Sequence, residues 1–114
     1  MIKPVPLHTM IDQYEFVPQA IIAETVDELA KRFGSGVEKG HDNLDEYQGA
    51  AAWLDELPFT VMHYRGHPKD TSTIYLPLDI VDVGNITDIV SRIASELELS
   101  SNSIIWQRKN DPAL

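Results

Sequence analysis

The chain has 114 residues, 43% of them hydrophobic and 24% charged, with no cysteine and a formal net charge of −9. A chain of this length and composition folds as one globular domain that buries about two thirds of the surface its unfolded chain would expose. The lack of cysteine excludes disulfides, thiolate metal sites and cysteine nucleophiles, and the negative charge argues against a nucleic-acid partner, because such binding starts from a basic surface.

The N-terminal residues 1–18 contain three prolines, and we predict an irregular segment there. They lack the long apolar segment of a signal peptide, and no apolar run in the chain reaches the roughly 20 residues of a membrane span. We therefore expect a cytoplasmic protein without a membrane partner. Residues 19–23, Gln-Ala-Ile-Ile-Ala, form a short apolar run typical of a strand buried on both faces.

A capping box at Thr25 and Glu28 predicts a helix over residues 26–33, because the threonine side chain accepts from the amide three residues on and the glutamate reaches back. Apolar side chains follow at helical spacing, and Gly34 supplies a stop. The spaced residues are Val26, Leu29, Ala30 and Phe33.

The same cap pattern recurs at Asn43 and Glu46 and predicts a second helical piece that ends at Pro58. Gly49 counts against it, since glycine costs about 1 kcal/mol relative to alanine inside a helix. The predicted apolar stripe is Leu44, Tyr47, Ala50, Ala51, Leu54 and Leu57.

Two β-rich runs, residues 59–64 and 72–76, flank Gly66 and Pro68 and predict a hairpin with a long loop. After Asn85, residues 86–97 keep an apolar face at helical spacing, which predicts another helix. Residues 104–108 predict a last strand, and residues 109–114 a loose tail.

From residue 19 these elements are β, α in two pieces, β, β, α and β. The order predicts a single α+β domain over residues 1–114 with a two-layer, ferredoxin-like βαββαβ fold. In such a fold the helices cover one sheet face and leave the other open. An open face that carries Tyr64 or His63, Tyr75 and Trp106 predicts a homodimer or higher homo-oligomer, although aromatic residues also fill ordinary cores.

The hairpin sequence 63–73 admits two kinds of site. His63, His67 and Asp70 offer ligands for a divalent ion, whereas Arg65, Lys69 and the hydroxyls of Thr71, Ser72 and Thr73 suit an anion such as phosphate or carboxylate. The simplest interpretation is a polar turn, in which Gly66 supplies an unusual dihedral angle. Because the loop has neither thiols nor a helical HExxH pattern, we predict no metal and no cofactor.

Strand alternation decides where the first histidine lies. If Val61 faces the core, His63 is buried beside it, whereas if Met62 and Tyr64 face the core, His63 and Arg65 emerge together toward the loop. His8 and His41 lie in loop-like contexts, and we assign them no role.

The acidic residues gather in the first half of the chain. Between residues 12 and 56, eleven acids stand against three bases, a local net charge of −8, which favours a basic protein partner. The acids are Asp12, Glu15, Glu24, Asp27, Glu28, Glu38, Asp42, Asp45, Glu46, Asp55 and Glu56.

Two functional hypotheses follow. The sequence favours a small acidic interaction or regulatory protein that self-associates, rather than an enzyme. The alternative is a domain that binds a small molecule, an anion or a metal through the 63–73 hairpin and acts as a small enzyme. The candidate ligand-binding residues are His63, Tyr64, Arg65, His67, Asp70, Tyr75 and Trp106, and no catalytic residue is predicted.

Overall fold

The computed structural model describes residues 2–41, 45–81 and 86–107. Its strands are β1 (Ile2–Val5), β2 (Phe16–Ile22), β3 (Glu38–His41), β4 (Glu46–Leu54), β5 (Leu57–Tyr64), β6 (Ser72–Pro77) and β7 (Ile104–Gln107). Its helices are α1 (Leu7–Ile11), α2 (Val26–Arg32), α3 (Leu78–Val81) and α4 (Ile86–Glu96), with a 3-10 turn at Ser101–Ser103. None of the described helices is long and apolar enough to cross a membrane.

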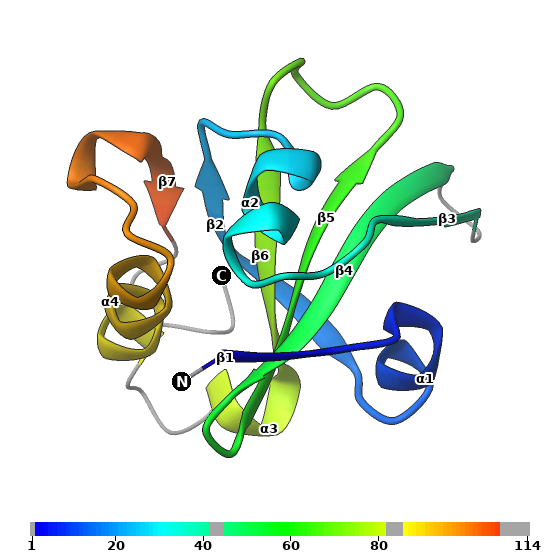
Figure 1. Cartoon of the computed structure of the whole chain (residues 1–114), viewed down its shortest axis with the longest axis horizontal. Helices are drawn as coiled ribbons and strands as arrows, with labels where there is room; N and C mark the ends of the chain where they lie inside the picture. Colours follow the sequence, from blue (N-terminus) through cyan, green and yellow to red (C-terminus); the bar gives the residue numbers. More distant parts are fainter. Residues whose placement is uncertain (1, 42–44, 82–85, 108–114) are drawn as a thin grey trace.

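All seven strands join one antiparallel sheet, with the order β1-β4-β5-β6-β2-β7 (Figure 1). The long strand β4 pairs with β5 on one side. On its other side it pairs with two short strands, β3 along its first half and β1 along its second. This brings the N-terminal strand and β3 to the same edge of the sheet.

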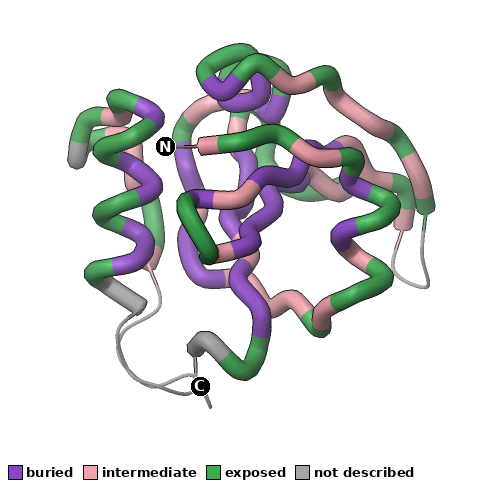
Figure 2. Tube along the Cα trace, turned by 60° about the horizontal axis from the view of Figure 1, so that its bottom comes forward, coloured by how far each residue is buried: buried purple, intermediate pink, exposed green. Residues whose placement is uncertain are grey.

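Helices α2 and α4 cover one face of the sheet, which we call the α2/α4 face. Their apolar residues and those of the strands form the main buried cluster, which includes Leu29, Phe59, Val61, Ile74 and Ile93. Figure 2 shows that the buried positions run through the sheet and along one side of α4, whose other side is exposed. The chain therefore has its main core between these helices and the sheet.

The opposite face, which we call the α1 face, is covered in part by α1. Leu7 and Met10 pack there against Ala51, with half-buried aromatic residues around them. Because β4 is covered on both sides, its central residues Ala50, Ala51 and Ala52 are all buried. The sheet is thus less open than a two-layer sandwich would leave it.

The predicted helix over residues 44–57 is wrong, because Glu46–Leu54 forms strand β4 and Leu57 begins β5. An amphipathic helix would bury only one side of this segment. In the sheet, β4 is covered on both faces and needs small side chains on both. Gly49 meets this need most closely, since a Cβ there would lie 2.9 Å from Leu7 Cδ2 and 3.1 Å from the Val61 carbonyl oxygen. Asn43 and Leu44 of the predicted helix lie outside the described residues.

The prediction of an irregular segment over residues 1–18 is also wrong. The three prolines occupy places where a missing amide hydrogen is tolerated. Pro4 lies in the short edge strand β1, Pro6 is the N-cap of α1, and Pro18 lies at a register shift in β2. These positions let β1, α1 and the first part of β2 form.

The other predicted elements are confirmed as parts of a mixed α+β domain. Strand β2 contains most of the run predicted over residues 19–23, β5 and β6 form the hairpin, α4 forms, and β7 is the last described strand. The ferredoxin-like order is not confirmed, because seven strands replace the four of βαββαβ. Asn85 and the predicted tail 109–114 lie outside the described residues.

Helix α2 begins with the capping box that its sequence predicts. Thr25 Oγ1 accepts from the Glu28 amide at 3.1 Å, and the Thr25 amide donates to Glu28 Oε1 at 3.1 Å. Gly34 follows the helix at φ 73°, a conformation that favours glycine. The local signals therefore place both ends of this helix.

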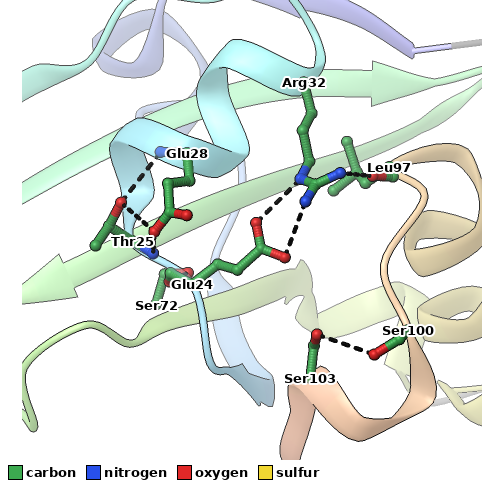
Figure 3. Close-up of polar contacts among 8 residues, drawn as sticks. All are labelled: Glu24, Thr25, Glu28, Arg32, Ser72, Leu97, Ser100 and Ser103. Carbon is green, nitrogen blue, oxygen red and sulfur yellow. Dashed lines mark hydrogen bonds and ion pairs between the residues drawn. The ribbon is translucent and has the colours of Figure 1, made fainter.

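Arg32, the last residue of α2, ties this helix to the end of α4 (Figure 3). Its Nε and Nη2 donate to the two carboxylate oxygens of Glu24 at 3.0 and 3.1 Å. Its Nη1 donates to the Leu97 carbonyl oxygen at 2.9 Å. Ser72 of β6 donates to the Glu24 carbonyl oxygen at 2.8 Å, which connects the same cluster to the sheet.

A carboxylate from β3 holds the start of α1. Pro6, the N-cap residue, makes no side-chain cap, and Glu38 accepts hydrogen bonds from the amides of Leu7 and His8 instead. His8 Nδ1 lies 2.8 Å from the same carboxylate. Burial raises the pKa of Glu38, but the hydrogen bonds from His8 and Leu7 outweigh it and hold the pKa below its ordinary value.

We expect Glu38→Gln to lower the free energy of unfolding at pH 7 by about 1 kcal/mol, the usual value of a helix cap. Because the folded pKa is depressed, the ionised carboxylate stabilises the fold above the reference value of 4.5, and this contribution is lost as the pH falls below it. Urea denaturation at pH 7 and at about pH 4 should show that the free energy of unfolding falls less between these pH values in the variant than in the unmodified protein. Equal losses in the variant and the unmodified protein would refute this role, and Glu56→Gln, at an exposed turn, is the matched control.

Candidate functional site

Three neighbouring strands, β3, β4 and β5, place six polar residues on the α2/α4 face. Residues directly opposite in antiparallel strands project to the same face. One row contains Lys39, Gln48 and His63, and the next contains His41, Glu46 and Arg65. The two rows continue the strands past the buried core, where α2 and α4 no longer cover the sheet.

The loop between β5 and β6 adds to this region. Gly66 has φ 95°, and the His67 amide donates to the Tyr64 carbonyl at 3.1 Å, which forms a tight turn that needs a glycine. His63 Nδ1 lies 2.8 Å from the Thr71 carbonyl oxygen. Since a carbonyl only accepts, Nδ1 carries a proton, and Nε2 remains for a ligand.

Together the two rows and the loop line an open groove of about 1010 Å³, which we call the histidine groove. Small-molecule sites have volumes of about 300–1,000 Å³. The groove contains three of the chain's four histidines and three of its nine lysine and arginine residues. Its lining is Lys39, Gly40, His41, Glu46, Tyr47, Gln48, His63, Arg65, Gly66, His67 and Lys69.

The cations of the groove differ in how far they are neutralised. Arg65 pairs with Asp45 at 3.1 Å and with Glu46 at 3.4 Å. Neither Lys39 nor Lys69 has an ion-pair partner within the part of the chain that the structure describes. The two lysines therefore supply the uncompensated positive charge of the groove.

Val61 faces the main core, and His63 lies on the same face, yet the histidine is only half-buried. Met62 is buried as well, on the opposite face. We expected His63 to be buried if Val61 faces the core, and His63 and Arg65 to be exposed only if Met62 faces it. This expectation is wrong, because both faces of β5 are covered near Val61, whereas His63 lies beyond the covered part of the strand. His63 and Arg65 therefore line the groove together.

The two hairpin histidines come together, with ring centroids 6.2 Å apart. Asp70 does not complete a metal site with them, since no group of three or more His, Asp and Glu side chains suited to a metal occurs in residues 2–41, 45–81 and 86–107. Asp70 is exposed at the end of the loop, where it has φ 59°. The structure thus joins only three of the seven candidate residues, His63, Arg65 and His67, in the groove.

The three aromatic candidates do not line the groove, although the ring centroid of Tyr64 lies 5.7 Å from that of His67. Tyr64 and Tyr75 line a different cavity, on the α1 face. Trp106 lies in strand β7, opposite Ile21, and is 42% exposed. The predicted single site therefore divides into separate regions on the two faces of the sheet.

Sequence reasoning missed the residues that β3 and β4 contribute to the groove. His41 was expected in a loop without a role, and Glu46 was expected to cap a helix. Alternation was the available signal, since Lys39 and His41 in one strand, and Glu46 and Gln48 in the next, are two positions apart. Comparisons with known proteins find no significant match, whether to family models, to curated protein sequences or to solved structures.

Several acidic residues of the first half are paired with basic side chains. Glu24 pairs with Arg32, and Asp55 with Arg92 at 3.0 Å. Glu38 is engaged by α1, and Asp45 and Glu46 by Arg65. Pairs distributed over α1, α2 and the β4–β5 turn weaken the local field that the sequence suggests.

Proposed function

We propose that this protein binds a small anionic ligand, such as a phosphate or a carboxylate, in the histidine groove. One observation carries the proposal: in a chain of net charge −9, three histidines and three cations line a single groove. Chance distribution of so few basic groups would scatter them over the surface. Their concentration favours a ligand of opposite charge.

The proposed roles follow from the chemistry of each side chain. Lys39 and Lys69 act as point charges, which suits both phosphates and carboxylates. The amide of Gln48 adds a directional hydrogen bond, and His63 Nε2 donates one to an anion only when both ring nitrogens carry a proton. Arg65 is held by Asp45 and Glu46, and it contributes less to the ligand than the lysines do. We assign binding to this site, and no catalytic residue.

We expect inorganic phosphate or succinate to bind in isothermal titration, and the double variant Lys39→Gln, Lys69→Gln to weaken binding at least tenfold. Lys31→Gln, an exposed substitution on α2, is the matched control. If neither anion binds at about 10 mM, where even a very weak site fills, or if the double variant binds equally well, the proposal fails.

The exposed apolar residues of β7 support a second proposal, the self-association favoured by the sequence. Ile105 is 58% and Trp106 42% exposed, and β7 forms an edge of the sheet. Apolar edge strands tend to pair with another chain. Native mass spectrometry of the same protein would count the subunits and detect any retained anion, and a strictly monomeric species at high micromolar concentration would exclude self-association. A basic protein partner and a cytoplasmic location remain expectations from composition alone.

A further inference from the structure

The α1 face carries a second cavity, of about 440 Å³, which lies between α1 and strands β4, β5 and β6. All four tyrosines of the chain line it. They are Tyr14, Tyr47, Tyr64 and Tyr75, accompanied by Phe16 and Asp12. We call this cavity the tyrosine pocket.

The sheet register explains why residues so far apart in sequence gather here. Tyr47 and Tyr64 are opposite each other in β4 and β5, and Tyr75 is opposite Thr60 in β6, on the same face. Tyr14 lies in the segment that joins α1 to β2. Three strands and the α1 connection thus each supply one phenol ring.

The rings meet at steep angles rather than in a stack. Tyr47 and Tyr64 have centroids 5.6 Å apart with planes at 62°, and Tyr14 and Phe16 have centroids 5.8 Å apart with planes at 65°. Because rings at steep angles do not stack against each other, they leave a hollow between them, which these aromatic side chains line. All four tyrosines are half-buried, so the hollow is accessible from solvent.

The charge around the pocket favours a cation. Asp12 is the only lining residue with a formal charge at neutral pH when histidine is neutral, and the whole chain carries −9. Aromatic faces attract cations through the ring quadrupole, and clusters of aromatic rings recognise quaternary ammonium groups. Such a group has no N–H donors and therefore needs no hydrogen-bond acceptors from the pocket.

We propose that the tyrosine pocket binds a small organic cation with a quaternary ammonium group. The volume lies within the range of small-molecule sites, about 300–1,000 Å³. The pocket opens on the other sheet face from the histidine groove, and its charge selects the opposite kind of ligand. His41 and Tyr47 line both cavities, which meet at the end of β3.

The test uses choline and its neutral isostere 3,3-dimethyl-1-butanol, in which carbon replaces the nitrogen. We expect choline to shift the NMR signals of tyrosine-pocket residues and to bind at least tenfold more tightly than the isostere, as a cation–π contribution requires. Equal affinity for choline and the isostere would show that the pocket binds through apolar contact alone and would overturn the proposal. The absence of any NMR shift at about 10 mM choline would also overturn it.

Paired variants separate ring chemistry from folding. Tyr75→Phe keeps the π face and should bind choline within about threefold of the unmodified protein, whereas Tyr75→Leu should lose at least tenfold. Thermal unfolding of both variants shows whether the fold is retained. Asp12→Asn should weaken choline binding severalfold, while the matched exposed substitution Glu15→Gln should not. Equal binding by the Phe and Leu variants contradicts the proposal, whatever the outcome for phosphate in the histidine groove.

Discussion

Gly49→Val is expected to lower the free energy of unfolding by about 3 kcal/mol, the upper part of the range for an overpacked core. A side chain at this position of β4 meets Leu7 Cδ2 at 2.9 Å, Met62 Cγ at 3.0 Å and the Val61 carbonyl oxygen at 3.1 Å. The Leu7 and Met62 side chains are buried and have little room to move, and the carbonyl belongs to the backbone of β5. We therefore expect the substitution to loosen the packing of α1 against the sheet.

Urea denaturation followed by circular dichroism measures this loss. Gly36→Val is the matched control, because nothing lies within 4 Å of a Cβ at that glycine. If both variants lose the same free energy, close packing of α1 against β4 is not the cause. Since α1 borders the tyrosine pocket through Ile11, Gly49→Val should also weaken choline binding.

Arg32→Ala is expected to cost about 2 kcal/mol, because it removes three hydrogen bonds from a charged donor and leaves the Glu24 carboxylate without its partner. The Glu24 side chain is only 13% exposed, so water replaces the arginine poorly. Lysine at position 32 would keep the charge but cannot make the same bidentate contact. Arg32→Lys should therefore recover less than half of the lost free energy.

The measurements are chemical denaturation and amide hydrogen exchange of α4. Exchange should accelerate in α4 of the alanine variant, since Arg32 joins α2 to the Leu97 carbonyl at the end of that helix. Lys31→Ala, one residue earlier on the exposed side of α2, should change neither quantity appreciably. A fully stable Arg32→Lys variant would show that charge alone matters and would refute the geometric argument.

Elements whose ends or faces are set by residues close together in sequence could be predicted from the sequence. The capping box of Thr25 and Glu28 marks the start of α2, and Gly66 marks the turn of the β5–β6 hairpin. The apolar face of residues 86–97 indicates α4 in the same way. In each case the deciding contacts lie within a few residues of one another in sequence.

The rest of the fold depends on contacts that are remote in sequence. Residues 46–54 satisfy helical spacing as well as strand spacing, and only burial on both sides selects the strand. That burial requires α1, whose start is held by Glu38, 31 residues after Leu7. No local sequence pattern predicts the contact between Glu38 and Leu7.

Groove residues could be predicted only where the strand or loop that carries them was predicted. His63, Arg65 and His67 were found because they lie in a recognisable hairpin. Lys39, His41 and Gln48 were missed because the strands that carry them were not recognised. Tyr64 and Tyr75 were found as candidate ligand-binding residues, but alternation along β5 sends Tyr64 to the face opposite His63.

The position of β2 in the sheet has a consequence for folding during synthesis. Both strands that pair with β2, β6 and β7, come later in the chain, and about 50 residues separate the end of β2 from the start of β6. At a synthesis rate of about 5–20 residues per second, the apolar segment Phe16–Ile22 waits for several seconds before a partner strand emerges from the ribosome. Pro18 and the register shift beside it interrupt this segment, which hinders pairing with other nascent chains while it waits. The completed sheet thus depends on distant pairings, and we expect it to fold in the slow range typical of such topologies.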